Sequence, residues 1–265
     1  MKKFWGFLLV IVLMTSCGDQ SLLKSNDYNL VYKKAIEYYN KGDYQRAMNL
    51  LDGVRSVFVG QAKAQNIAYY RAFCSYNMKD YQIASDLFKQ FIQTYPESSF
   101  AEECLYMMGF CDYKASPKPR LDQQVTEKAI REFQLYLSRY PYSMRKDKVN
   151  TYMDEMRDKL SYKAYLSAKN YYLREHYKAA VISLQNCLKD YPGSKYREEI
   201  MYMLFVSKYQ MAVNSVEDKK VERYNNAREE YYYFADEYPN SRYAADVKKM
   251  YEDIEAYLEN YKFED

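Results

Sequence analysis

A four-residue motif, Tyr-Pro-x-Ser, recurs along the chain and divides it into units of similar length. Its four copies begin at residues 95, 140, 191 and 238. Proline ends a helix because its ring removes a backbone donor, and serine is a favoured residue at the start of a new helix. The copies lie 45 to 51 residues apart. This spacing predicts a repeated unit in which two helices are joined by a turn.

A second turn recurs within these units, at residues 41–44, 78–81 and 174–177. In the helical pattern that follows, a small residue is succeeded four positions later by a large one on the same helix face. Five such pairs are present: Ala47 and Leu51, Ala84 and Phe88, Ala129 and Phe133, Ala180 and Leu184, Ala227 and Tyr231. This pattern resembles the tetratricopeptide repeat, in which an alanine lets two helices approach closely.

Few residues in the chain would interrupt a helix, because it contains only 7 glycines and 6 prolines. We therefore predict an all-α fold. It should be an α-solenoid of about five tetratricopeptide-like helix pairs, closed by a C-terminal capping helix near residues 241–261. Repeats 1–3 are expected at residues 28–143, and repeats 4–5 with the capping helix at residues 144–265. A loop is expected at residues 217–223.

The first helix of each predicted pair carries two tyrosines that are seven residues apart. The pairs are Tyr32 and Tyr39, Tyr69 and Tyr76, Tyr106 and Tyr113, Tyr165 and Tyr172, Tyr202 and Tyr209. Seven residues make two helical turns, so both tyrosines of a pair lie on one helix face. Two roles remain open for them. They line the inner wall of the solenoid as structural residues, or they form aromatic anchors for an extended peptide or a partner helix.

The N-terminus has the features of a bacterial secretory signal. Lys2 and Lys3 precede an apolar run of 11 residues, 4–14, which is too short to span a bilayer. The sequence Met-Thr-Ser-Cys at residues 14–17 then resembles the lipobox of bacterial lipoproteins. We predict a signal peptide at residues 1–16, diacylglycerol and N-acyl lipid on Cys17, and a linker at residues 17–27. A soluble secretory peptide and an uncleaved helix are the alternatives.

The composition argues against several classes of function. Without Lys2 and Lys3 the formal charge is only +1, whereas a nucleic-acid-binding surface needs a basic excess. The only histidine, His176, occupies the position of a turn residue, and no glycine-rich phosphate loop is present. We therefore predict no enzymatic activity, no catalytic residue, no metal and no cofactor apart from the covalent lipid. Buried free thiols are expected at the remaining cysteines, with a disulfide left open: Cys74, Cys104, Cys111 and Cys187.

Three further segments carry a family resemblance. Residues 91–98, Phe-Ile-Gln-Thr-Tyr-Pro-Glu-Ser, are followed by Tyr-Met-Met-Gly at residues 106–109, and Asp-Gln-Gln at 122–124 precedes Ala129. Together with the lipobox and five repeats, they resemble the BamD family, lipoprotein subunits of the outer-membrane β-barrel assembly machine. The resemblance covers nearly the whole mature chain. Met14 in the lipobox, the abundance of tyrosine and the 217–223 segment depart from the common family pattern.

The resemblance implies a location and two kinds of partner. The chain would be lipid-anchored at the periplasmic face of the outer membrane and would receive unfolded outer-membrane proteins through a groove that binds their C-terminal strand signal. The candidate groove residues are Tyr32, Tyr39, Tyr69, Tyr76, Tyr106 and Tyr113. The C-terminal repeats would dock on the POTRA domains of a BamA-type barrel protein, with Lys189 and Asp190 as candidate contacts.

Two alternatives to this interpretation are retained. Lys189 also suits a solvated helix end, because a cation stabilises the C-terminal end of the helix dipole. The chain could also be another periplasmic tetratricopeptide scaffold lipoprotein that acts in envelope biogenesis, in a peptidoglycan complex or in a secretion complex. Such a scaffold would keep the solenoid and lose the contact with BamA.

Replacement of Cys17 by alanine tests the lipid anchor. Each buried CH₂ group contributes about 0.8 kcal/mol to membrane affinity, so the loss of two or three acyl chains should release the chain. We expect the Cys17→Ala variant to move from the membrane fraction to the soluble fraction, as measured by fractionation and immunoblotting. The Cys187→Ala variant, which keeps the lipobox, should remain in the membrane fraction. Persistent membrane association of Cys17→Ala would contradict the anchor.

Overall fold

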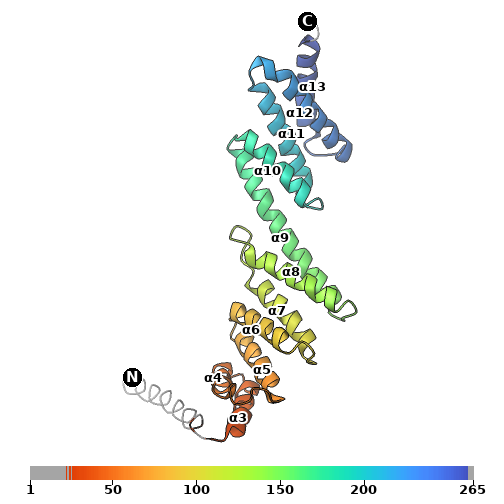
Figure 1. The fold of residues 1–265 in the computed structure, drawn as a ribbon. Helices are drawn as coiled ribbons and strands as arrows, with labels where there is room; N and C mark the ends of the chain where they lie inside the picture. Colours follow the sequence, from red (N-terminus) through yellow and green to blue (C-terminus); the bar gives the residue numbers. More distant parts are fainter. Residues whose placement is uncertain (1–21, 23, 25, 262–265) are drawn as a thin grey trace, which may run out of the picture. The chain divides into compact units, whose positions relative to one another are not determined.

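The structure, a computed structural model, describes residues 22, 24 and 26–261. The described chain from residue 26 onward consists of α-helices joined by turns (Figure 1), which confirms the predicted all-α class. Successive helices form antiparallel pairs of the tetratricopeptide type. The helices are α3 (Tyr28–Asn40), α4 (Tyr44–Val54), α5 (Lys63–Asn77), α6 (Tyr81–Thr94), α7 (Ala101–Ala115), α8 (Gln124–Arg139), α9 (Lys146–Leu173), α10 (Tyr177–Asp190), α11 (Arg197–Val213), α12 (Glu217–Glu237) and α13 (Ala244–Tyr261).

The expected solenoid of five pairs with a closing helix is confirmed in the described residues. The pairs run from α3 and α4 to α11 and α12, and α13 packs against both helices of the last pair. The expected loop at 217–223 is wrong, because α12 begins at Glu217. Glu217 and Asp218 lie in its first turn, where negative charge stabilises the N-terminal end of a helix. Only residues 214–216 connect α11 to α12.

The contacts divide the chain into two compact units. Unit 1 contains the described residues up to Pro117 and Leu121–Met156, and unit 2 contains Lys118–Arg120 and the described residues from Arg157 onward. The boundary between the units therefore lies within the long helix α9. Each unit contains two clusters of buried apolar side chains.

The turn between the two helices of a pair has the same backbone form in three repeats. Gly42, Lys79 and Glu175 adopt positive φ angles of 79°, 67° and 60°. The next residue in each turn donates its amide to the carbonyl of the residue five positions earlier, at Tyr38, Ser75 and Tyr171 respectively. These bonds satisfy carbonyls that the helix end leaves without partners. His176 occupies the turn position predicted for it.

The Tyr-Pro-x-Ser turns also share one hydrogen-bond pattern. In the first copy, the Tyr95 amide closes α6 by donating to the Phe91 carbonyl, and the Ser98 amide donates to the Tyr95 carbonyl. The Ser98 hydroxyl accepts from the Phe100 amide, one residue before α7 begins. The serine therefore orders the turn, and it does not occupy the N-cap position itself. The other three copies repeat these contacts.

Small residues lie where paired helices approach closely. All five predicted alanines are fully buried: Ala47, Ala84, Ala129, Ala180 and Ala227. Gly109 has the same role on α7, because a Cβ atom at this position would lie 2.9 Å from Cδ1 of Phe133 on α8. Phe133 is itself fully buried, and close packing in a protein interior restricts the movement of its ring. The α7–α8 contact therefore requires glycine at position 109.

We expect Gly109→Ala to destabilise unit 1. The added methyl group would overpack the α7–α8 contact, at a cost of roughly 1–3 kcal/mol in the free energy of unfolding. Urea denaturation followed by circular dichroism would measure this loss. Gly193→Ala is the matched control, because a Cβ atom there meets nothing within 4 Å. Equal stability of the Gly109→Ala variant and the wild type would refute the packing argument.

Candidate functional site

The first two predicted tyrosine pairs lie on α3 and α5 and are partly buried among other rings. Tyr32 packs edge-on against Phe58, with centroids 6.3 Å apart, and Tyr39 contacts Tyr70 at 4.9 Å. Burial raises the pKa of Tyr39 to about 12. Both side chains therefore use part of their aromatic surface to attach α3 to its neighbours.

Tyr69 and Tyr76 make the corresponding contacts from α5 toward α6 and α7. The ring of Tyr69 lies 4.6 Å from that of Phe100, and its hydroxyl donates to Glu103 Oε2 at 2.8 Å. Burial, followed by the Glu103 carboxylate, raises the pKa of Tyr69. Tyr76 packs against Phe110 of α7 at 6.2 Å. This pair therefore joins the second helix pair to the third.

The third pair lies on α7 and combines a buried tyrosine with a partly buried one. Tyr106 is only 7% exposed, and the guanidinium of Arg145 lies over its ring, 4.8 Å from the centroid. Tyr113 stacks on Tyr152 of α9 at 4.4 Å and donates to Glu155 Oε2 at 2.5 Å. All six tyrosines therefore make packing contacts within unit 1. Only the partly exposed edges remain available to a partner.

The later tyrosine pairs repeat this arrangement inside unit 2. Tyr165 stacks on Tyr196 at 4.4 Å, and Tyr202 stacks on Tyr243 at 4.0 Å with an interplanar angle of 10°. Tyr209 donates to Asp253 Oδ2 at 3.2 Å. Tyrosines of one helix pair therefore pack against the next helix pair in both units, and the abundance of tyrosine has a structural cause.

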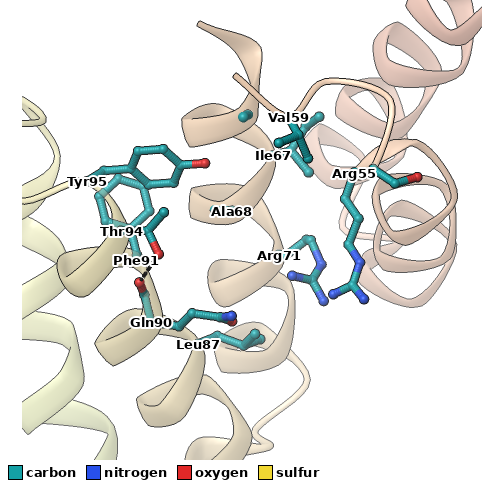
Figure 2. A pocket seen from close by; sticks show the side chains of 12 residues that line it. Arg55, Val59, Ile67, Ala68, Arg71, Leu87, Gln90, Phe91, Thr94 and Tyr95 are labelled. Atoms are coloured by element: carbon teal, nitrogen blue, oxygen red, sulfur yellow. Dashed lines mark hydrogen bonds between the residues drawn. The ribbon is translucent and has the colours of Figure 1, made fainter. Parts of the chain in front are cut away.

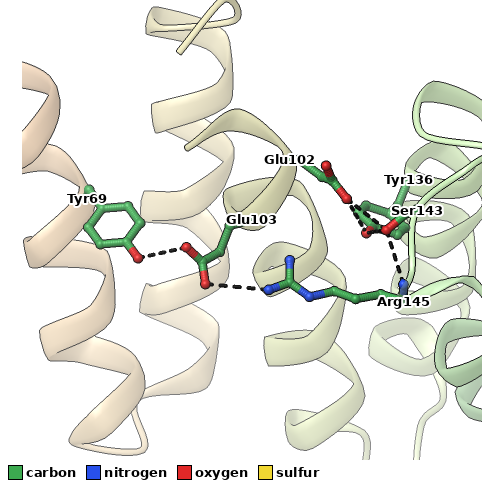
Figure 3. A network of polar contacts seen from close by, with 6 residues as sticks. All are labelled: Tyr69, Glu102, Glu103, Tyr136, Ser143 and Arg145. Atoms are coloured by element: carbon green, nitrogen blue, oxygen red, sulfur yellow. Dashed lines mark hydrogen bonds and ion pairs between the residues drawn. The ribbon is translucent and has the colours of Figure 1, made fainter. Parts of the chain in front are cut away.

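A polar network joins successive repeats in unit 1 (Figure 3). Glu102 Oε1 accepts hydrogen bonds from the hydroxyls of Ser143 at 2.7 Å and Tyr136 at 3.0 Å. The neighbouring Glu103, which accepts from Tyr69, forms an ion pair with Arg145 at 3.7 Å. The network thus ties α5 and α7 to the Tyr-Pro-x-Ser turn of the following repeat.

The same acid pair recurs in unit 2. Glu198 accepts from the Ser241 hydroxyl at 2.6 Å, and Glu199 accepts from Lys169 at 2.7 Å. Each acid pair lies four and five residues after a Tyr-Pro-x-Ser serine. That spacing was visible in the sequence, but the partners lie 30 to 43 residues away. Only the folded chain identifies these acids as links between repeats.

An ionic cluster with two buried carboxyl groups and a partly exposed lysine lies among α6, α7 and α8. Lys128 Nζ lies 2.9 Å from Asp112 Oδ2 and 3.6 Å from Glu132 Oε1, and Ser85 donates to Asp112 at 2.9 Å. Burial, followed by the interaction with Asp112, raises the pKa of Glu132 to about 8. Perturbed carboxyl groups often mark catalytic sites. Here both carboxyl groups are buried inside the helix core, so we assign the cluster a structural role.

A pocket of about 330 Å³ lies between α5, α6 and the segment after α4 (Figure 2). Ile67, Leu87 and Phe91 give it apolar walls. Arg55 and Arg71 also line it; Arg71 is paired with Asp52 at 2.6 Å, whereas Arg55 is exposed. The residues come from three segments, 55–59, 64–71 and 87–95, and the sequence alone does not show that these segments line one pocket. Sequence reasoning therefore missed this site.

The remaining predicted site residues lie elsewhere. Lys189 and Asp190 are the last two residues of α10 in unit 2, and both are exposed. They are therefore accessible to a partner, and Lys189 also lies where a cation suits the helix dipole. Cys17 lies outside the described residues.

The described part of the chain has free cysteines, no metal cluster and no helix that could span a membrane. Cys74, Cys104, Cys111 and Cys187 are buried free thiols, and burial raises the pKa of Cys187 to about 11. Residues 22, 24 and 26–261 contain no cluster of three histidine, cysteine or acidic side chains suited to a metal ion. Within the same range, every helix is too short or too polar to cross a bilayer.

Solved structures that match the chain at low sequence identity include two tetratricopeptide proteins. One is a tetratricopeptide repeat protein from Bacteroides fragilis, with 13% identity, a TM-score of 0.42, and coverage of 88% of this chain and 99% of that chain. Another is the TPR2AB domain of yeast Sti1 in a pHSP90 complex, with 14% identity, a TM-score of 0.39, and coverage of 86% and 98%. No curated protein sequence matches the chain.

A family model described as YfiO, outer membrane lipoprotein, matches residues 24–199 and 163–264. The two matched segments overlap, and together they cover the five helix pairs and α13. The family is the BamD family that the sequence motifs resemble. Because the match extends over most of the chain, this protein belongs to the YfiO family of outer membrane lipoproteins.

Proposed function

We propose that the chain is a non-enzymatic scaffold subunit of the outer-membrane β-barrel assembly machine. The observation that carries the proposal is the family match, which extends from residue 24 to residue 264. In this proposal, lipid on Cys17 holds the chain at the periplasmic face of the outer membrane. Unit 1 receives unfolded outer-membrane proteins, and unit 2 docks on the POTRA domains of a BamA-type barrel protein.

The polar residues of the described repeats support binding rather than catalysis. The acid pair Glu102 and Glu103 is occupied by bonds to neighbouring repeats, and Glu132 is buried beside Lys128. A general base must reach a substrate proton within hydrogen-bond distance. Carboxyl groups engaged in such links do not meet this condition, so recognition would rest on shape, apolar contact and charge.

In unit 1, the pocket beside α5 and α6 is the best candidate for substrate reception. Its apolar walls can enclose a side chain of an extended peptide. The exposed guanidinium of Arg55 lies at the same pocket and suits a free C-terminal carboxylate, since charge-assisted bonds to arginine are strong. The partly exposed edges of Tyr32, Tyr39 and Tyr76 would add contacts beyond it.

In unit 2, the end of α10 offers adjacent charges of opposite sign. Lys189 and Asp190 are both exposed, so each can pair with an opposite charge on a folded partner. Such pairs at the edge of an interface set orientation and association rate. This property suits docking on a POTRA domain.

Charge reversal at Lys189 tests the docking site. We expect the mature lipidated chain to capture a large POTRA-containing barrel protein from detergent-solubilised envelopes, and Lys189→Glu to weaken capture about tenfold through like-charge repulsion. Lys178→Glu is the control, because Lys178 is an exposed lysine on the same helix. Quantitative mass spectrometry of the captured proteins is the measurement.

Two other outcomes of the capture experiment are informative. Undiminished capture by Lys189→Glu would retain the function and move the docking site to another surface. Enrichment of a different envelope complex, without the barrel protein, would refute the assembly role. It would favour the alternative scaffold in peptidoglycan synthesis or secretion.

A peptide-binding measurement tests the pocket of unit 1. Peptides that match the last strand of an outer-membrane protein should bind about tenfold more tightly with a free C-terminal carboxylate than with an amidated end. The Arg55→Glu variant should lose this difference, as measured by fluorescence anisotropy. Lys89→Glu, on the exposed side of α6, should retain it. Equal binding of both peptides to the wild type would exclude Arg55 as the carboxylate contact.

A further inference from the structure

The second Tyr-Pro-x-Ser turn, at residues 140–143, and the residue that follows it expose two large apolar side chains. Tyr142 is 97% exposed and Met144 is 102% exposed, so neither side chain packs against any part of the described chain. They flank Ser143, which is engaged in the network of Figure 3. The turn therefore holds its backbone firmly and projects both side chains into solvent.

The other three copies of the turn show that folding does not require these side chains. The residue after proline is Glu97, Gly193 or Asn240 in the other copies, and Tyr142 in this one. The residue after serine is Ser99, Lys195 or Arg242 in the other copies, and Met144 in this one. All four turns form the same backbone and serine hydrogen bonds. The two apolar side chains are therefore additions to a turn that folds without them.

Basic residues surround this apolar pair. Residues 139–148 contain Arg139, Arg145, Lys146 and Lys148 against one acid, Asp147. Arg145 is already engaged inside unit 1, because it forms an ion pair with Glu103. Arg139, Lys146 and Lys148 are exposed. The segment therefore presents an apolar tip with a cationic rim.

We infer that residues 139–148, here called the Tyr142 tip, contact the anionic phospholipid headgroups of the membrane to which the chain is anchored. Tyrosine suits the interface of a bilayer because its ring is apolar and its hydroxyl remains hydrated. Methionine adds a flexible apolar side chain, and lysines near an anionic surface are attracted to it. None of these contacts is required by the proposed assembly function.

The exposure of the tip favours a bilayer over a protein partner. A protein would need a preformed pocket complementary to two side chains that are exposed on all sides. A fluid headgroup layer closes around such a tip without a matching shape. The family to which the chain belongs consists of outer membrane lipoproteins, so a bilayer is its permanent neighbour.

A tryptophan at position 142 provides the test. Trp5 is the only tryptophan of the sequence and lies in the predicted signal peptide, so the mature Tyr142→Trp chain carries a single reporter. The lipidated chain would be reconstituted in vesicles of phosphatidylethanolamine and phosphatidylglycerol that contain brominated lipids. We expect a blue-shifted emission that the brominated lipids quench. In the same vesicles, Glu97→Trp, at the equivalent position of the first turn, should not be quenched.

Changes in the rim and in the lipid give a quantitative check. Lys146→Ser in the Tyr142→Trp background should lower the ratio of bound to free tip about fivefold, because one cation near the surface is lost. Pure phosphatidylcholine vesicles should lower it further. Absence of quenching at position 142 in anionic vesicles would overturn the proposal, as would equal quenching at positions 97 and 142. Capture of a barrel protein should be unchanged whether or not the Tyr142 tip contacts lipid. The lipid contact and the proposed assembly function can therefore fail independently.

Discussion

Within each unit, the two helices of a pair pack against each other and also against the neighbouring pair, so each pair depends on its neighbour to cover a further apolar face. This dependence explains why Tyr76 of the second pair packs against Phe110 of the third. It also explains why α13 packs against the last pair, since the final face would otherwise be exposed. In a solenoid, stability is approximately the sum of such neighbour contacts.

The tyrosines serve these contacts in a way that aliphatic residues could not. A tyrosine ring covers a large apolar area, while its hydroxyl reaches a carboxylate on the neighbouring pair, as Tyr69 reaches Glu103 and Tyr113 reaches Glu155. Ring stacking and a polar link are thereby combined in one side chain. This combination leaves less of the aromatic face accessible to partners. Pockets and turns are therefore better candidates for binding sites.

The surfaces that remain available differ between the two units. Unit 1 has an apolar pocket with an exposed arginine, and unit 2 exposes opposite charges at the end of α10. The Tyr142 tip adds an apolar surface that the repeat itself does not need. A repeat architecture permits such differences between surfaces, because turn residues can vary while the core positions and the serine hydrogen bonds stay the same.

The amino-acid sequence alone determined the helix pairs, the two recurring turns, the buried alanines and the family resemblance. These features depend on residues a few positions apart, where helical periodicity and turn chemistry act locally. Tertiary structure decided the rest. It showed α12 in place of the expected loop, assigned the acid pairs to links between repeats, and assembled the pocket of Arg55 from three segments. It also showed that the tyrosine rings pack internally while Tyr142 does not. The reason is that burial and partner choice depend on side chains that lie tens of residues apart, and their positions are set only when the helix pairs stack.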